Sequence, residues 1–492
     1  MSSDLKPQGI SETISRAYEV DRFRQQGHAL IDRLAQHLEN CQNRLNPSSY
    51  PAPEPESEKA FWSAWLQEHR GNSSGLANAI EQTLIRANQL QDPRYMGHQV
   101  AVSMPSQALV GMVTDLLNNG QAIYEMGPSN AALEELLMAE IGEAMGLPAG
   151  CGGILCHGGT LGNLVALMAA QRQLGLRQGT DVWTEGIAAA EPVAVLVSDQ
   201  AHYCVDRAVR TLGWGRDAIF AVETDKQHRM DMADLERKAH MARSEGRILL
   251  AVVGSACTTS TGAFDPLASI GQWAKKNKIW FHVDGAHGAP VAFSKRHRHL
   301  VQGIEEADSV VMDFHKLCSM PALCTGVFYR EQEKSFLPFL QQAEYLWSNP
   351  DEQDWWDHGK RTLECTKRML SSRLLALRSE FGWSIWGDLV DQMWDITDQF
   401  ANEIERRSGW QLAIRPQANI VCFRPTQPAG IQPEQMNQIR SAYLATGSGY
   451  IVATILDGQP WFRCTFMNPL TQTSDFKRML NELEETIASV VA

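Results

Sequence analysis

Short apolar runs alternate with amphipathic segments through the middle of the chain. The apolar runs predict β-strands at residues 192–199, 218–224, 247–256, 278–284, 309–314 and 325–330. Between them lie helical patterns such as DMADLERKAHMARSEG and DPLASIGQWAKKNK. In the second pattern, Asp265 is expected to cap the helix and Pro266 to occupy its first position. Wholly apolar strands that alternate with helices predict a mostly parallel sheet covered on both faces.

The two ends of the chain have different patterns. Residues 1–95 predict helices, because apolar side chains recur at helical spacing at Val20, Phe23, Leu30, Ile31, Leu34 and Leu38. A Pro- and Ser-rich break, NPSSYPAPEPESE, interrupts this pattern. Residues 361–492 combine long helical stretches with the strand-like segments GWQLAIRPQANIVCFRP and GYIVATILDGQPWFRCTF, which predicts a smaller α+β domain. The domains are therefore expected to span 1–95, 96–360 and 361–492.

Composition narrows the class of protein. The 492 residues are 44% hydrophobic and 21% charged, with a net charge of −13, which argues against a nucleic-acid-binding surface over the whole molecule. The ten cysteines form no CxxC pair, so neither a zinc site nor any other metal site is expected. The amino-terminal segment has no apolar signal-peptide core, and no run reaches the ~18 apolar residues of a membrane span. We expect a cytoplasmic protein with no membrane partner.

Polar residues follow several of the predicted strands, where parallel α/β sheets bind ligands. They include His202, Thr258, Thr259, Asp284, His315 and Lys316. Upstream, Gly158, Gly159 and Thr160 precede a helix whose free N–H groups and dipole favour a phosphate. Each feature alone has an ordinary structural reading, such as a turn, a cap or a core histidine. Together they are the parts that pyridoxal phosphate requires: a lysine for a Schiff base, an aspartate for the ring nitrogen, a histidine that stacks and a phosphate cradle.

The motifs resemble the group II pyridoxal-phosphate-dependent amino-acid decarboxylases, which include glutamate, aromatic-amino-acid and 2,4-diaminobutyrate decarboxylases. The similar segments are FRQQGHALIDRLAQHL, GGTLGNLVALMAAQ, SDQAHYCVDRA, FHVDGAHG, DFHKL, AEYLW and WFRCTFMNPLTQTSDFKRML. The resemblance implies the type I, aspartate-aminotransferase-like fold and a homodimer with active sites shared between subunits. Residues 1–95 would then serve dimerisation, and residues 96–360 would bind the cofactor.

The resemblance also implies roles for individual residues. Lys316 would form the Schiff base, with His315 beside it, Asp284 on the ring nitrogen, and Ala286 and His202 against the ring. Gly159 and Thr160 would hold the phosphate, and Thr259 would contact the cofactor. Tyr345 would donate a proton to Cα, and Arg463 would contact a substrate carboxylate. His98 and Gln99 lie on a segment that aligns with a substrate-side loop, although packing at the dimer interface is an equal alternative.

The function implied by the resemblance is α-decarboxylation of an L-amino acid to its amine and carbon dioxide. Another outcome on the same scaffold, such as aldehyde synthesis or a lyase reaction, stays open, as does a catalytically silent scaffold protein. Gly285 and His287 depart from the small residue and aromatic residue of many relatives, and DFHK has Phe314 before His-Lys where proline is commoner. Arg463 could contact a side-chain carboxylate or the common core of any substrate. The sequence therefore leaves the substrate open.

Overall fold

The computed structural model describes residues 10–51, 53–69, 71, 74–339 and 354–491, and they form two compact units. The first unit comprises residues 1–95 with 443–450, and the second comprises the rest of the chain. The predicted boundary between residues 96–360 and 361–492 stays a prediction. No helix in the described part of the chain is both long and apolar enough to cross a membrane.

The first unit is helical, as its sequence pattern predicts. Its helices are α1 (Glu12–Ala17), α2 (Val20–Gln42), α3 (Pro55–Glu68) and α4 (Gly75–Arg86). Ion pairs join them, because Arg33 on α2 binds Glu81 on α4 at 2.7 Å and Arg86 on α4 binds Glu58 on α3. Apolar side chains on α2 nevertheless stay exposed, among them Val20 and Phe23.

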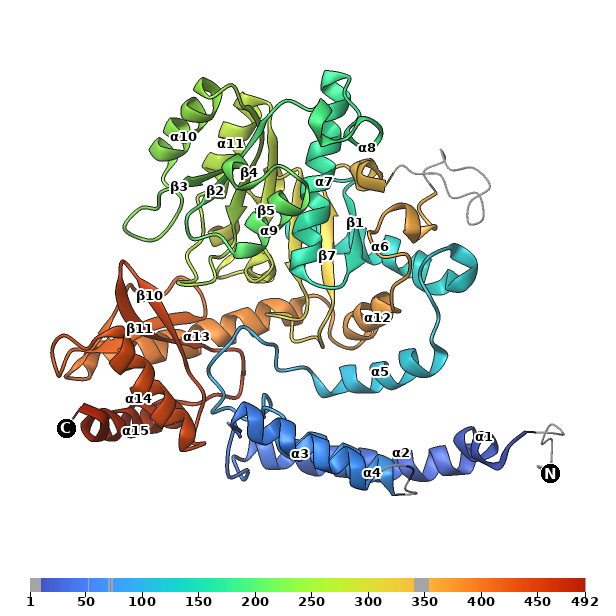
Figure 1. Cartoon of the computed structure of the whole chain (residues 1–492), viewed down its shortest axis with the longest axis vertical. Coiled ribbons are helices and arrows are strands. Elements are labelled where there is room, and N and C mark those ends of the chain that lie inside the picture. The colour runs from blue at the N-terminus through green and yellow to red at the C-terminus, as the bar shows by residue number, and fades with distance from the viewer. Residues whose placement is uncertain (1–9, 52, 70, 72–73, 340–353, 492) are drawn as a thin grey trace. The chain divides into compact units, whose positions relative to one another are not determined.

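The second unit is built around a seven-stranded sheet, visible in Figure 1, with the order β1-β7-β6-β5-β4-β2-β3. Its strands are β1 (Gly152–Cys156), β2 (Val193–Ser198), β3 (Ile219–Val222), β4 (Ile248–Ser255), β5 (Trp280–Asp284), β6 (Ser309–Asp313) and β7 (Thr325–Tyr329). The pairs from β6 to β3 are parallel, and β7 runs antiparallel to both of its neighbours. The structure therefore confirms the mostly parallel α/β fold. The hydrophobic pattern missed β1, whose sequence GGILC begins with two glycines.

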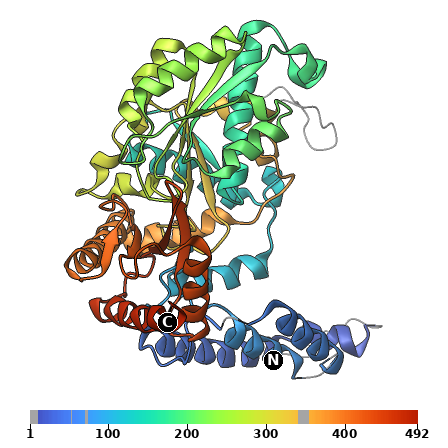
Figure 2. The same ribbon diagram turned by 60° about the vertical axis from the view of Figure 1, so that its left-hand side comes forward.

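Helices cover both faces of this sheet, as Figure 2 shows. They are α6 (Pro128–Met145), α7 (Gly159–Gln178), α9 (Tyr203–Thr211), α10 (Met232–Ser244), α11 (Leu267–Asn277) and α12 (Leu370–Phe381). Two further helices are α5 (Pro105–Leu117), which packs against α12, and the short α8 (Val182–Glu185), which follows α7 along the chain. Alternate strand residues point to opposite faces. Leu196 and Phe281 accordingly pack in the core that contains α6, α10 and α11, whereas Val195 and Val311 pack in the core that contains α7 and α9.

The predicted cap of α11 was wrong. Pro266, not Asp265, occupies the N-cap position, and no side chain caps the helix. The Asp265 carboxylate instead accepts hydrogen bonds from the backbone N–H groups of Met230 at 2.7 Å and Ser255 at 2.8 Å. The two donors lie 35 and 10 residues before Asp265, so the local Asp-Pro pattern could not reveal these hydrogen bonds. Asp265 thereby fixes the end of β4.

The carboxyl-terminal part of the second unit is α+β. It contains α13 (Ser384–Arg406), β8 (Trp410–Leu412), β9 (Ile420–Pro425), α14 (Pro433–Ala445), β10 (Val452–Leu456), β11 (Gln459–Thr465) and α15 (Thr473–Val491). The strands form an antiparallel sheet with the order β10-β11-β9-β8. Phe400 on α13 packs against Phe423 on β9 and against Phe476 on α15. These rings fill the space between the sheet and its helices.

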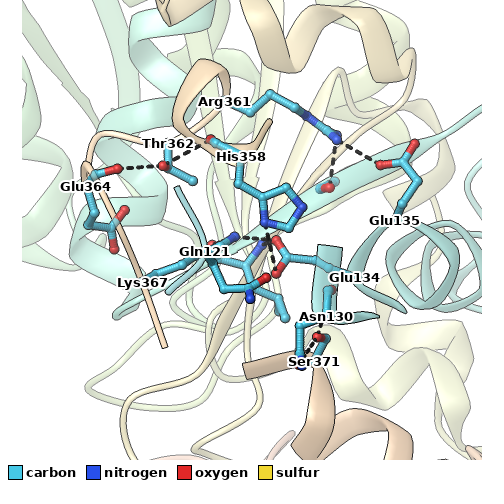
Figure 3. A network of polar contacts seen from close by, with 12 residues as sticks. Gln121, Asn130, Glu134, Glu135, His358, Arg361, Thr362, Glu364, Lys367 and Ser371 are labelled. Atoms are coloured by element: carbon cyan, nitrogen blue, oxygen red, sulfur yellow. Dashed lines mark hydrogen bonds and ion pairs between the residues drawn. The ribbon is translucent and has the colours of Figure 1, made fainter. Parts of the chain in front are cut away.

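A buried polar network lies between α6 and the segment 358–371 of the same unit (Figure 3). We call it the Lys367 network, and its members are Gln121, Asn130, Glu134, Glu135, His358, Arg361, Thr362, Glu364, Lys367 and Ser371. Lys367 binds Glu134 and donates to the Leu155 carbonyl at 2.7 Å. Arg361 binds Glu135 at 2.8 Å and donates to the Gly153 carbonyl at 3.0 Å. The network therefore ties segment 358–371 to α6 and β1.

Candidate active site

A cavity of about 390 Å³ opens at the carboxyl ends of β4, β5 and β6. Its lining residues are Gln99, His157, Gly158, Gly159, Thr160, Asn163, His202, Cys204, Ser255, Cys257, Thr259, Asp284, Ala286, His287, Asp313, His315, Lys316 and Leu323. This is the edge at which a parallel α/β sheet binds its ligand. All eight residues that the sequence assigned to a cofactor line this one cavity.

Lys316 lies in the turn that follows β6. Its backbone N–H donates to the Asp313 carbonyl at 3.1 Å, and its Nζ lies 3.0 Å from Asp313 Oδ2. A quarter of the side chain stays exposed, toward the cavity that it lines. Burial acts to lower the pKa of Lys316, but the nearby Asp313 and Asp284 carboxylates outweigh it and raise this pKa above the ordinary value. Lys316 is therefore a half-buried amine that a ligand in the cavity can reach.

Asp284 ends β5 and is almost fully buried. Its Oδ1 accepts the backbone N–H of Ala286 at 3.2 Å, and its Oδ2 lies 3.7 Å from the Cys204 Sγ. Burial, and then the Asp284 charge, raise the pKa of Cys204, so this residue is a neutral thiol able to donate. The carboxylate is thus fixed at the strand end that borders the cavity.

His202 is the N-cap residue of α9. Its Nδ1 accepts the backbone N–H of Cys204 at 3.3 Å, which fixes the orientation of the ring. Burial lowers the pKa of His202, although the Asp284 carboxylate acts in the opposite direction. The result is a neutral imidazole held at the cavity wall, as a stacking role requires.

The amino terminus of the 20-residue helix α7 borders the cavity through Gly159 and Thr160. Gly158 precedes it with φ of 107°, a conformation that favours glycine, and caps it without a side chain. A Cβ on Gly159 would lie 2.9 Å from Asp313 Oδ2 and 3.3 Å from the Ala286 Cβ, so only glycine fits. The first amides of a helix have no intrahelical acceptor. With the helix dipole, those of Gly159 and Thr160 suit a phosphate group.

His315 lines the cavity beside Lys316. Its Nδ1 lies 2.8 Å from the Cys324 carbonyl oxygen and 3.2 Å from the Cys324 nitrogen, and its Nε2 lies 3.7 Å from Asp313 Oδ2. The main chain of Cys324 thereby holds the ring in place.

Arg463 on β11 is buried and contacts two cavity residues without lining the cavity itself. Its Nη2 donates to the Thr259 carbonyl at 2.7 Å and to Gln99 Oε1 at 3.2 Å, and its Nε donates to the Ser260 carbonyl at 3.2 Å. Within the described ranges, no carboxylate forms an ion pair with it. Burial lowers the pKa of Arg463. The guanidinium is thus a buried cation held by neutral groups.

The other predicted site residues are His98 and Tyr345. His98 is adjacent to Gln99 but does not line the cavity, and burial lowers its pKa. Tyr345 lies outside the described residues.

The cavity residues that the sequence did not assign include Asp313, His157 and Cys204. His157 binds Glu364 of the Lys367 network at 2.9 Å. All three stand inside motifs that were recognised, DFHK, CHGGT and AHYC, which was the available signal. The partners of His157 and Cys204, which are Glu364 and Asp284, lie 207 and 80 residues away, and only the fold brings them together.

The residues present fit pyridoxal phosphate. One cavity contains an amine, a carboxylate fixed at a strand end, a neutral imidazole and a helix amino terminus that a side chain on Gly159 would block. These groups match the aldehyde, ring nitrogen, ring face and phosphate of that cofactor.

Comparisons with known proteins agree with this geometry. The family described as "Pyridoxal-dependent decarboxylase conserved domain" matches residues 55–426. The chain is 28% identical over 446 residues to cysteine sulfinic acid decarboxylase of Mus musculus, covering 88% of this chain and 89% of that one. It is 30% identical over 424 residues to L-2,4-diaminobutyrate decarboxylase of Rhizobium meliloti, covering 85% and 82%.

A solved structure supports the fold. The glutamate decarboxylase domain of a diaminobutyrate-pyruvate transaminase and L-2,4-diaminobutyrate decarboxylase from Vibrio parahaemolyticus superposes with a TM-score of 0.83. The identity is 23%, and the match covers 94% of this chain and 95% of that one.

Proposed function

This chain belongs to the pyridoxal-dependent decarboxylase family, and from that premise we propose that the cavity around Lys316 is its active site. The protein is a pyridoxal-phosphate-dependent carboxy-lyase that converts an L-amino acid into an amine and carbon dioxide. The observation that carries the site assignment is the convergence of Lys316, Asp284, His202 and the α7 amino terminus on one cavity.

Each residue has a task that its surroundings support. Lys316 would hold the aldehyde carbon through Nζ, and the amides of Gly159 and Thr160 would bind the phosphate. Bound pyridoxal phosphate supplies an electron sink for the pair left on Cα when carbon dioxide departs.

The remaining cavity residues would orient the cofactor ring and polarise it. Asp284 would keep the ring nitrogen protonated, because its carboxylate is fixed by Ala286 and Cys204. His202 would cover one ring face and Ala286 the other, while Thr259 and His315 would contact the cofactor from the cavity wall. Tyr345 stays our candidate for the proton donor to Cα.

We further propose that the substrate has an acidic side chain. Gln99 lines the cavity, and because its Oε1 accepts from Arg463, its Nε2 is left to act as a donor. Behind it lies the Arg463 guanidinium without a carboxylate partner in the described part of the chain. A donor backed by a buried cation favours an anion. Binding the departing carboxylate this strongly would stabilise the ground state, so the side-chain carboxylate is the better partner.

A substrate panel tests this proposal. Carbon dioxide release and amine mass should be measured with L-aspartate, L-glutamate, L-cysteine sulfinate, L-2,4-diaminobutyrate, L-tryptophan and L-leucine. We expect the highest kcat/KM with an acidic substrate and a loss of that preference in Arg463→Met. A preference for diaminobutyrate would contradict the acidic assignment, whereas no carbon dioxide from any substrate would contradict the active-site assignment.

We also propose a cytoplasmic homodimer with shared active sites. The ten cysteines are unpaired, which supports a reducing compartment. Exposed apolar side chains on α2 and on α5, such as Phe23, Leu109 and Val113, suit burial against a second copy. Mixing inactive Lys316→Ala and Tyr345→Phe subunits should restore activity in mixed dimers. Absence of recovery after proven subunit exchange would contradict shared sites.

A further inference from the structure

Asp313 occupies a constrained position between Lys316 and the phosphate end of the cavity. It is the last residue of β6, is 2% exposed and lines the cavity. Its Oδ2 lies 3.0 Å from Lys316 Nζ, and its Oδ1 accepts the Thr325 hydroxyl at 2.5 Å. Its backbone N–H donates to the Ala286 carbonyl at 3.0 Å. Strand β7 and the backbone of β6 thus hold the carboxylate against the lysine.

The same carboxylate occupies the space next to Gly159 at the start of α7. A Cβ on Gly159 would lie within 2.9 Å of Oδ2 and 3.1 Å of Oδ1. Asp313 therefore lies between two positive groups, the Lys316 ammonium and the amino-terminal end of a helix. Neither the resemblance nor the assigned roles give this residue a task.

We propose that Asp313 is a positioning residue for Lys316, a counter-ion that holds Nζ in place and sets the pH above which Lys316 becomes a free amine able to take the cofactor. The proposal rests on the proposed role of Lys316. Only the neutral amine has the electron pair needed to bond to an aldehyde carbon. The ammonium must first leave the Asp313 carboxylate and release one proton to solvent through the cavity.

The groups that face Lys316 come from several elements. The anions are Asp313 on β6 and Asp284 on β5. Cys204 on α9 is neutral because burial raises its pKa. Among the histidines, burial lowers the pKa of His202 and of His287, to about 3 for His287. His315 follows β6, and its Nε2 lies 3.7 Å from the same Asp313 Oδ2. Asp313 is the only one of these groups in direct contact with Nζ, so its charge has the largest effect.

The test measures the lysine without using turnover. Full-length protein freed of cofactor is treated briefly with acetic anhydride across pH 6–11, and acetylation of the Lys316 peptide is quantified by mass spectrometry. In Asp313→Asn, the midpoint of the pH profile should fall by about one unit or more, because an opposite charge at this distance favours the ammonium. At pH 7.5 that shift makes Lys316 about tenfold more reactive.

Thr325→Val is the matched control, because it removes the hydroxyl that contacts Asp313 and keeps the charge. Its midpoint should shift by much less than that of Asp313→Asn. Reassociation of pyridoxal phosphate, followed by absorbance, should show the same shift in Asp313→Asn. If Asp313→Asn fails to fold by circular dichroism, Asp313→Ser gives the same comparison.

An unchanged or higher midpoint in a folded Asp313 variant would overturn the proposal. A shifted midpoint in Thr325→Val of equal size would do so too, because positioning by the hydroxyl and not the carboxylate charge would then be responsible. Failure of the proposed function is separable: borohydride trapping of pyridoxal phosphate would then label no Lys316 peptide, whatever the acetylation profile.

Discussion

Two lysines in the second unit each contact a buried carboxylate, and they differ in access from the cavity. Lys316 contacts Asp313 and keeps a quarter of its side chain exposed to the cavity, whereas Lys367 contacts Glu134 with none exposed. The carboxylates around Lys316 outweigh burial and raise its pKa; burial outweighs Glu134 and lowers the pKa of Lys367. Contact with a buried carboxylate is therefore common to both lysines, and access from the cavity distinguishes Lys316.

The two regions also use their polar atoms differently. Lys367 is held by Glu134 and by the Leu155 carbonyl, in a network that joins segment 358–371 to α6 (Figure 3). Lys316 has one side-chain partner on the described chain and a cavity beside it. We expect substitutions at Lys316 to affect activity and substitutions at Lys367 to affect folding.

The largest effect is expected at Lys316. Lys316→Ala should abolish turnover, because among the described residues that line the cavity Lys316 is the only lysine and so the only candidate to hold the cofactor aldehyde. The melting temperature should stay near the wild-type value, since the side chain lines a cavity. Carbon dioxide release and thermal unfolding measure the two outcomes. Steady-state decarboxylation in the pure variant would contradict the assignment.

The opposite pattern is expected at Lys367. Lys367→Met leaves the Glu134 carboxylate buried without its cation, which typically costs about 3–5 kcal/mol in free energy of unfolding. Urea unfolding followed by circular dichroism measures this loss.

The double variant Lys367→Met, Glu134→Leu is the control for that loss. It removes both charges and should recover much of the stability, because apolar replacements of a buried pair are often neutral. If Lys367→Met were as stable as the wild type, the ion pair with Glu134 would not contribute to stability. The proposed contrast between a structural Lys367 and a functional Lys316 would then be wrong.

A smaller effect is expected for Asp284, the anion fixed on β5. Removing a group that stabilises charge in the transition state typically lowers the rate by about 10²–10³. Asp284→Asn keeps the shape and should lose this much kcat while the cofactor stays bound, as absorbance can show. A near-normal rate would mean that the carboxylate only supports the Ala286 turn.

Sequence reasoning reached the cavity and missed the Lys367 network for a physical reason. Lys316 follows an apolar strand inside a local motif. The other residues proposed to bind the cofactor follow strand ends or begin α7, at the edge where parallel sheets bind ligands. Lys367 stands in LECTKRML, which has no distinctive local pattern, and its partner Glu134 lies 233 residues away.

Asp265 illustrates the same limit within a recognised segment. Its position before a proline predicted a helix cap, yet the carboxylate binds the backbone of Met230 and Ser255. A short polar side chain chooses among nearby donors only after the fold is formed.

The smallest effect at neutral pH is expected at His358, a sealed member of the Lys367 network. It is 1% exposed, and burial lowers its pKa to about 3. The charges of Lys367 and Arg361 also lower this pKa. The Glu134 carboxylate, whose Oε2 lies 3.8 Å from His358 Nδ1, acts to raise it. Below pH ~6.5 the His358 ring therefore binds a proton in the unfolded chain, whereas in the folded chain it stays neutral down to about pH 3. The contribution of the neutral His358 ring to the free energy of unfolding is complete above pH ~6.5 and is lost as the pH falls toward 3. His358→Gln cannot titrate, so its free energy of unfolding should stay within about 1 kcal/mol of wild type at pH 7.5 and decline less steeply toward pH 4.5. Urea unfolding at both pH values checks this, and parallel declines would mean that water or a ligand reaches the ring in the folded protein.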